Sequence, residues 1–310
     1  MYFVIDVIAP VFVIVLIGYV AVKLKIFPGS GISALIAFTN NFAAPMLLFR
    51  AMLTLDFATA LDPKIIAPFY VAGLAGFVLG IVLARKTFAY RPGEAVSVGF
   101  SGWFTNTVLL GIPIVQRAYG VEALPIIFLI IGFHAPSLMT IGMMTMELSR
   151  RDGRPLGVAI IDALKRIATN PLLIGIACGV TLNLSGLSLP KVLDDATIMM
   201  VAAVLPTALF GLGAALTQYS IKKAVWPAAM MSLIKTLLHP FLAWVILVPI
   251  LGVPHEVSRA VVLLAAMPSG INAYIFATYY NRALDVATST VLLSTLISVF
   301  SISFWLWFLS

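Results

Sequence analysis

The sequence has few charged residues, three histidines and a single cysteine. Only 10% of its 310 residues are charged, against about 25% in soluble domains, and 62% are hydrophobic, against about 45–50%. A core of this length cannot bury so much apolar surface away from water, which indicates a protein solvated by lipid. The lone Cys178 excludes a disulfide framework, and the histidines are too far apart in sequence to show metal-site spacing. Neither a metal nor another cofactor is expected.

The net charge of +7 does not indicate nucleic-acid binding, because the basic residues lie in short loops between apolar segments. Ten segments are long and apolar enough to cross about 30 Å of hydrocarbon as helices. They are 4–22, 32–53, 65–84, 95–119, 123–146, 168–187, 195–217, 224–250, 257–280 and 286–308. The predicted fold is an all-α polytopic membrane protein with ten transmembrane helices.

Lysine and arginine are distributed unequally between the two sides of the membrane. Loops after the odd-numbered segments hold 13 of the 19 basic residues and the opposite side holds five, with Lys235 left inside the eighth segment. Because positive loops face the cytoplasm, both termini are predicted to lie outside. The 13 predicted cytoplasmic residues are Lys23, Lys25, Arg85, Lys86, Arg91, Arg150, Arg151, Arg154, Lys165, Arg166, Lys222, Lys223 and Arg282.

The connection 148–167 divides the ten segments into two groups of five, within one integral membrane domain. It is predicted to be a cytoplasmic linker, and its apolar residues fit either a short helix on the membrane surface or the solvated start of the sixth segment. Because five is odd, the second half (168–310) must enter from the side opposite to the first half (1–147). Related halves would then form two inverted five-helix repeats, a common plan for secondary transporters.

Two short matches support such a repeat. Pro45-Met-Leu-Leu-Phe49 and Pro206-Thr-Ala-Leu-Phe210 share P-x-x-L-F at an offset of 161 residues. Gly111-Ile-Pro113 and Gly270-Ile-Asn272 match at an offset of 159. Both matches fall in corresponding segments of the two halves.

Glycine and proline interrupt the fourth and ninth segments near mid-membrane, within 105–113 and 267–273. Each interruption exposes half-helix ends, whose N–H groups attract anions and whose carbonyls attract cations. Such paired, broken helices indicate a substrate site where they cross, and a kink without a ligand is the alternative. The predicted crossover residues are Gly111, Pro113, Pro268 and Gly270.

Three motifs bear a family resemblance: N-x-x-x-L-G-I-P from Asn106 to Pro113, Asn40-Asn41-Phe-Ala-Ala-Pro45-Met-Leu-Leu-Phe49, and Pro268-Ser-Gly-Ile-Asn-Ala-Tyr-Ile-Phe-Ala277. With the ten-segment plan they resemble the auxin efflux carrier family of bacterial and plant transporters over essentially the whole chain. The resemblance implies a secondary carrier, not an enzyme, that moves small organic anions by alternating access around the crossing helices. Bacterial members are associated with malonate, malate and similar carboxylates, and plant members with auxin. A bacterial member would lie in the inner membrane.

Two features depart from the family pattern. Where auxin carriers have a second crossover proline, this chain has Asn272-Ala273, so Pro268-Ser-Gly270 is expected to hold the second break. The central connection is also far shorter than the regulatory loop of many plant members. Plant-type phosphoregulation is therefore not expected, and auxin is only one candidate substrate.

Polar residues at membrane depth are the candidate substrate ligands. Lys235 would either pair with a substrate carboxylate or counter the C-terminal ends of half-helices at the crossover. Asn40 and Asn41 would either line the site or join packed helices through hydrogen bonds. The predicted substrate-binding residues are Asn40, Asn41, Asn106, Thr107, Gly111, Ile112, Pro113, Lys235, Ser269, Gly270 and Asn272.

His239 lies four residues after Lys235, on the same helix face, and is a candidate proton relay. His239 and His134 each lie near a proline, and the alternative for both is capping of the carbonyls that the proline frees. The sequence has no mid-membrane carboxylate pair, which argues against a simple sodium symporter. The coupling ion, a proton or sodium, is left open, and so is a homodimer.

Other functional classes fit the sequence less well. An intramembrane enzyme would need a motif such as H-E-x-x-H or G-x-S-x-G, and neither is present. A related carrier of the bile-acid or sodium–proton type is an alternative, as is a membrane channel or sensor that does not transport by a carrier mechanism. Saturable flux would separate a carrier from a channel.

Overall fold

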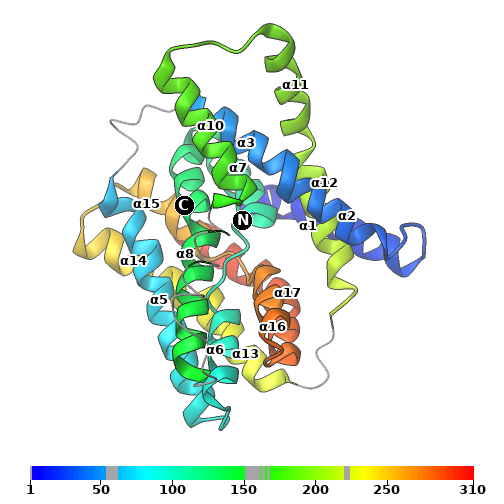
Figure 1. Cartoon of the computed structure of the whole chain (residues 1–310). Coiled ribbons are helices and arrows are strands. Elements are labelled where there is room, and N and C mark those ends of the chain that lie inside the picture. Colours follow the sequence, from blue (N-terminus) through cyan, green and yellow to red (C-terminus); the bar gives the residue numbers. More distant parts are fainter. Residues whose placement is uncertain (1, 54–61, 151–160, 162–164, 166–167, 220–223) are drawn as a thin grey trace.

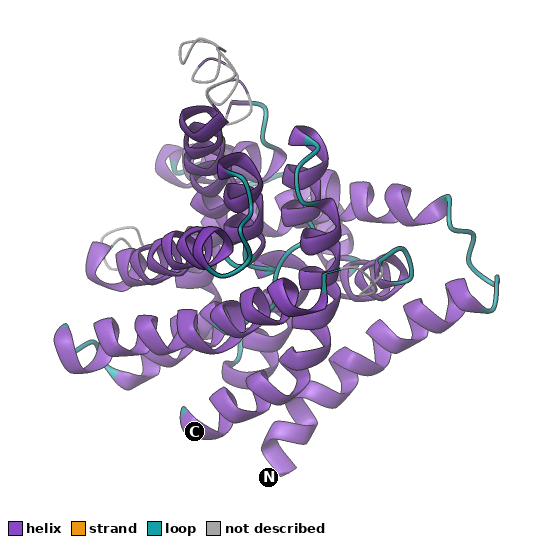
Figure 2. Ribbon diagram, turned by 90° about the horizontal axis from the view of Figure 1, so that it is seen from below, coloured by secondary structure: helices purple, strands orange, loops and turns teal. Residues whose placement is uncertain are grey.

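The computed structural model describes residues 2–53, 62–150, 161, 165, 168–219 and 224–310, and these ranges are helices joined mostly by short loops (Figure 2). Among the described residues there is no strand beyond one isolated pair of bridged residues. The α-helices are α1 (Tyr2–Lys23), α2 (Gly31–Phe38), α3 (Ala44–Leu53), α5 (Pro63–Lys86), α6 (Pro92–Ser101), α7 (Ile112–Tyr119), α8 (Leu124–Arg150), α10 (Pro171–Ser185), α11 (Lys191–Ala202), α12 (Val204–Leu216), α13 (Val225–Leu233), α14 (His239–Val245), α15 (His255–Ala265), α16 (Asn272–Tyr280) and α17 (Leu284–Phe308). Between the α-helices lie four π-helical turns and one 3-10 turn. The π-helical turns are η1 (Thr39–Ala43), η2 (Thr107–Gly111), η4 (Ile234–Leu238) and η5 (Ile246–Ile250), and the 3-10 turn is η3 (Val121–Ala123).

Seven helical stretches of the described chain are long and apolar enough to cross a membrane, which confirms the predicted all-α polytopic membrane fold. They are Val4–Lys23, Gly31–Leu53, Pro63–Lys86, Val121–Ser149, Lys191–Leu216, Val225–Ile250 and Leu284–Phe308. The other three expected spans coincide with α10, which has 15 residues, and with the broken pairs α6–α7 and α15–α16. At 1.5 Å per residue α10 reaches only about 22 Å, less than the hydrocarbon thickness. The count of ten transmembrane helices stays a prediction.

Two helices begin at an N-cap residue whose side chain accepts a capping hydrogen bond and which is followed by proline. The Asp62 carboxylate accepts a hydrogen bond from the Lys64 N–H at 2.8 Å, and the Asn170 side-chain oxygen accepts one from the Leu172 N–H at 2.9 Å. A capping oxygen satisfies an N–H that has no partner inside the helix, and a proline at the first position has no N–H to satisfy. This local chemistry fixes where α5 and α10 start.

Close glycine contacts join α1 to α12 and α3 to α10, helices from opposite halves of the chain (Figure 1). A Cβ atom at Gly18 would collide with the backbone carbonyl oxygen of Phe210, and a Cβ atom at Gly179 would collide with that of Phe49. Gly18 and Gly179 are 161 residues apart, and so are Phe49 and Phe210. The same backbone contact therefore occurs twice, at the offset of the P-x-x-L-F match.

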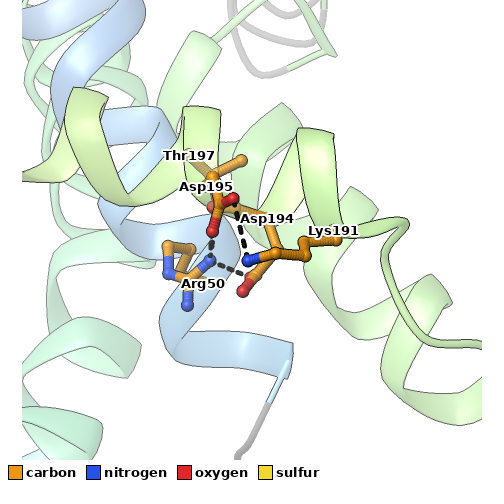
Figure 3. Close-up of polar contacts among 5 residues, drawn as sticks. All are labelled: Arg50, Lys191, Asp194, Asp195 and Thr197. Carbon is orange, nitrogen blue, oxygen red and sulfur yellow. Dashed lines mark hydrogen bonds and ion pairs between the residues drawn. The ribbon is translucent and has the colours of Figure 1, made fainter.

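Arg50 ties α3 to α11 (Figure 3). Its guanidinium forms an ion pair with the Asp194 carboxylate and donates a hydrogen bond to the Thr197 hydroxyl at 2.6 Å. A second ion pair in α11, between Lys191 and Asp195, stabilises the fold little because the Lys191 side chain is 88% exposed. Arg50 thus joins helices from the two halves of the chain.

Most of the predicted linker 148–167 lies outside the described residues, and so does the choice between a surface helix and the start of the sixth segment. The division into halves at 1–147 and 168–310 stays a prediction. The beginning of α1 and the end of α17 lie close together in both views of the molecule (Figures 1 and 2).

Candidate functional site

The interrupted helices α6–α7 and α15–α16 meet at their breaks. The chain is not helical at residues 102–106, before η2, and at residues 266–271, before α16. Thr105 in the first break and Ser269 in the second form an isolated antiparallel bridge. The broken helices predicted from the fourth and ninth segments therefore come together in the interior.

Backbone hydrogen bonds run in both directions across this crossing. The Asn106 N–H donates to the Pro268 carbonyl and the Gly270 N–H donates to the Phe104 carbonyl, both at 2.8 Å. Backbone groups at membrane depth need partners from the protein, because the surrounding lipid supplies none. Each break thus provides partners for the other.

The first break lies before Gly111 and Pro113, which corrects the predicted crossover. Gly111 ends the turn η2, where its N–H donates to the Asn106 carbonyl at 3.0 Å, and Pro113 lies in the first turn of α7. A proline fits there because first-turn N–H groups have no helical partner to lose. Pro268 and Gly270 lie in the second break, at the predicted position.

The Gly-Ile match between the two halves does not pair equivalent positions. Gly111 is helical, whereas Gly270 lies in the break. The bridged residues Thr105 and Ser269 are 164 positions apart, not 159. This match therefore does not support the internal repeat.

Ser269 is fully buried, and its polar atoms are used within the crossing. Its N–H donates to the Ser294 hydroxyl at 3.0 Å, and its own hydroxyl donates to the Ser101 carbonyl at 2.6 Å. Ser101 ends α6, so this hydroxyl caps the C-terminal end of the first half-helix. The geometry gives Ser269 a supporting position, whereas the sequence pattern predicts a substrate contact.

A cavity of about 260 Å³ lies against the crossing. Six of the predicted substrate-binding residues line it: Asn40, Asn41, Asn106, Thr107, Gly270 and Asn272. Thr107 begins η2 and Asn272 begins α16, so the N-terminal ends of both second half-helices border the cavity. Both asparagines of the second segment lie in the turn η1.

The other predicted ligands are not among the residues that line this cavity. Gly111, Ile112 and Pro113 are buried in the helix that follows the break, where Gly111 faces Leu264 of α15. Ser269 is buried within the crossing, and Lys235 is fully buried in the turn η4. These buried residues lie in or beside the crossing without lining the cavity.

Three polar residues that the predicted set does not include also line the cavity, namely Thr105 in the first break, His134 and Asn170. Asn170 caps α10, and its position before Pro171 is an N-cap signal that could have been used. His134 in α8 accepts a hydrogen bond from the Thr105 N–H at its Nε2, 3.1 Å away. It therefore binds an amide of the first break, not a carbonyl freed by Pro136, and no local pattern in the sequence indicates this partner.

Lys235 is fully buried in the turn η4, and its amine caps the C-terminal end of α15. Its amine donates to the Ala265 carbonyl at 2.6 Å, and Ala265 is the last residue of α15 before the break. Of the two roles considered for this lysine, the geometry favours support of a half-helix C-terminal end. A buried donor of this kind offsets carbonyl dipoles that water cannot reach.

His239 holds the lysine in place. Its Nε2 lies 2.9 Å from the Phe69 carbonyl oxygen and its Nδ1 lies 3.1 Å from the Lys235 amine. A carbonyl oxygen can only accept, so Nε2 carries the proton and Nδ1 accepts from the lysine. Both ring nitrogens are therefore engaged, and the proton relay stays a prediction.

A second cavity, of about 290 Å³, adjoins the first. The two share Ala135, Asn170, Pro171 and Asn272 in their linings. The second extends along α8 to Met143, toward the C-terminal end of that helix. Asn170 and Asn272 thus lie where the two cavities meet.

Comparisons with known proteins match the chain to membrane transporters. A sequence family described as "Membrane transport protein" matches residues 3–306. The chain is 26% identical to a "Putative malonate transporter" of Rhizobium meliloti (strain 1021), over 95% of this chain and 92% of that protein. It is 25% identical to an "Uncharacterized transporter" of Methanothermobacter thermautotrophicus, over 95% of each chain. It is 24% identical to "Auxin efflux carrier component 5" of Arabidopsis thaliana, over 96% of this chain and 94% of that protein.

Proposed function

This chain belongs to the auxin efflux carrier family of membrane transport proteins, and from that premise we propose that it is a secondary active carrier of small organic anions. The observation that carries the proposal is the polar cavity against two crossing helix breaks. Paired breaks of this kind are typical of binding sites in secondary transporters.

The ends of the half-helices favour an anion over a cation. The N-terminal ends at Thr107 and Asn272, which carry partial positive charge, border the cavity. The C-terminal ends at Ser101 and Ala265, which would attract a cation, already accept hydrogen bonds from Ser269 and Lys235. The cavity is therefore bordered by the ends that favour negative charge.

The size of the cavity favours a small substrate. At about 260 Å³ it is below the roughly 300–1,000 Å³ typical of pockets for drug-sized ligands. The names of the relatives include malonate and auxin, and malonate is the smaller of these two carboxylates. We infer that malonate-sized carboxylates are the first substrates to test, by an alternating-access cycle in which Asn106, Thr107, Gly270 and Asn272 contact the anion.

The proposed architecture is ten transmembrane helices in two inverted repeats, 1–147 and 168–310. The reciprocal contacts of Gly18 with Phe210 and of Gly179 with Phe49, at one offset, support it. The neighbouring ends of α1 and α17 also fit an even number of spans, which returns the chain to the side where it began (Figure 2).

We further propose that both termini face outward from a bacterial inner membrane and that the C-terminal end of α8 is cytoplasmic. The second cavity would then extend the site toward the cytoplasm. Lys86 and Lys191, both exposed at helix ends, suit a labelling test in a Cys178→Ala background. An impermeant thiol reagent is expected to label Lys191→Cys but not Lys86→Cys in intact cells, because positive loops stay inside. The reverse labelling pattern would invert the orientation.

Asn106→Ala tests the site itself. This substitution removes a polar group from the cavity wall. We expect uptake of malonate into proteoliposomes to fall at least about tenfold, because the variant loses one hydrogen bond to a charged group. Gln116→Ala is the matched control, because Gln116 lies in α7 and is not among the lining residues. Normal uptake by Asn106→Ala at equal reconstitution would remove this cavity from the mechanism. Failure of the wild-type protein to transport any small carboxylate would contradict the proposed function.

A further inference from the structure

Two buried hydrogen-bond donors at the cavity lack partners among the described residues. They are the side-chain amide nitrogen Nδ2 of Asn106 and the ring nitrogen Nδ1 of His134. The two residues are 5% and 2% exposed, and both line the cavity at the crossing. An unsatisfied buried donor is costly, so a pair of them beside one cavity calls for an explanation.

The hydrogen bond on the far side of the ring determines which nitrogen of His134 carries the proton. The Thr105 N–H can only donate, so Nε2 accepts and is unprotonated. The neutral ring then carries its proton on Nδ1, the nitrogen for which the described part of the chain supplies no partner. His134 therefore holds the first break with one nitrogen and presents a donor with the other.

Aromatic neighbours hold the imidazole in this orientation. The Phe104 ring lies edge-on with its centroid 4.7 Å away, and the Phe69 ring lies edge-on at 5.6 Å. Tyr70, whose ring centroid is 6.5 Å away, donates its hydroxyl to the Ile130 carbonyl at 2.6 Å and is itself fixed. The donor of His134 is thus preorganised, which lowers the entropic cost of binding a ligand.

We infer that His134 is a substrate-binding residue, which together with Asn106 binds one carboxylate group of the transported anion. A carboxylate has only acceptor atoms, and its two oxygens can each accept one of the two unpartnered donors. Hydrogen bonds to an ionised acceptor are stronger than those between neutral groups. The inference rests on the proposed function, because it names a further ligand residue at that same site.

Two substitutions separate the two faces of the imidazole. His134→Gln places an amide oxygen near the position of Nε2, where it can still accept from Thr105, but it removes the donor at the position of Nδ1. His134→Asn places an amide nitrogen near the position of Nδ1 but cannot reach Thr105. The first variant therefore tests the ligand contact and the second tests the support of the break.

The measurement is the Kd for malonate, from the shift in melting temperature of the purified full-length protein, with malonamide as the neutral analogue. We expect His134→Gln to keep a near-normal melting temperature without ligand and to raise the Kd at least about tenfold. His134→Asn is expected to have a lower melting temperature than the wild type but to bind malonate more tightly than His134→Gln does. Malonamide is expected to bind none of the three proteins at comparable concentrations.

The opposite pattern would overturn the inference. If His134→Gln binds malonate like the wild type and His134→Asn does not, the histidine acts only by holding Thr105. If both variants bind like the wild type, water satisfies Nδ1 and no carboxylate contact exists. If the wild type binds neither malonate nor a larger carboxylate, the proposed function fails first. Should either variant not fold, additive losses in Kd for Asn106→Ala and a His134→Phe variant would count against a shared carboxylate, since contacts to one group are expected to couple.

Discussion

Lys235→Met is expected to lower the melting temperature of the ligand-free protein more than any other single substitution of a lysine. Methionine keeps most of the aliphatic volume but removes the amine, which leaves the Ala265 carbonyl at the end of α15 without its donor. It also leaves the Nδ1 of His239 without its donor. A buried polar group left unsatisfied costs about 1–3 kcal/mol, and here two groups are affected at once. Since Lys235 is not among the residues lining the cavity, the folded fraction should bind malonate with nearly unchanged affinity.

Melting temperature and malonate affinity measured on one preparation of Lys235→Met distinguish the two roles considered for this lysine. Lys86→Met is the matched control, because Lys86 is exposed at the end of α5 and should melt like the wild type. Weakened malonate binding at an unchanged melting temperature would mean that the amine contacts substrate. No change in either quantity would mean that the hydrogen bond to Ala265 contributes nothing to stability.

Gly111→Leu is expected to abolish transport while the protein still reaches the membrane. A Cβ atom at this position would lie 2.6 Å from a methyl group of Leu264 in α15 and 3.4 Å from the Asn106 carbonyl oxygen. Leu264 is completely buried, so a further branched side chain has no room and must push η2 away from α15. A displacement of about 1 Å at a site that must position its ligand can cost roughly 100-fold in rate.

Gly29→Leu is the control for this experiment. A Cβ atom at Gly29 would have no atom of the described residues within 4 Å, and Gly29 does not have a positive φ, so the larger side chain should be accommodated. Malonate uptake in proteoliposomes at equal protein density compares the two variants. Gly111→Ala should fall between them, because a single methyl group meets only the end of the leucine side chain. Uptake by Gly111→Leu within about twofold of the wild type would show that the close approach of η2 to α15 is not needed.

The positions of the two breaks show how far the sequence determines this site. Pro268-Ser-Gly270 is correctly predicted to break the ninth segment, since proline and glycine both disfavour a helix there. The same reasoning misplaces the first break, because Pro113 is compatible with the first turn of α7. The true first break, at residues 102–106, includes Trp103, Phe104 and Thr105, and it is held open by hydrogen bonds to residues far away in the chain.

Local helix geometry is a second reason why the position of the candidate residues could not be predicted from the sequence. Asn40 and Asn41 lie in the π-helical turn η1, Thr107 lies in η2, and Lys235 lies in η4. Such turns are often found at functional sites, but they follow no hydrophobic period that a sequence pattern would reveal. The sequence therefore identifies these polar residues as candidates but does not predict which face of the helix each occupies. Whether a buried polar side chain supports a helix break depends on its neighbours in the tertiary structure. These are Ala265 for Lys235 and Thr105 for His134.

The reciprocal glycine contacts bear on the origin of the chain. Gly18 of the first half meets the Phe49 equivalent of the second half, Phe210, and Gly179 meets Phe49 in return. In an isologous interface between two identical subunits, residue i of one subunit contacts residue j of the other, and residue j of the first contacts residue i of the second. The two glycine contacts have this reciprocal form. A half-length ancestor with both residues would have carried a self-complementary surface. With the two proposed halves as inverted repeats, the present intramolecular contact has the symmetry of a homodimer of two half-length chains.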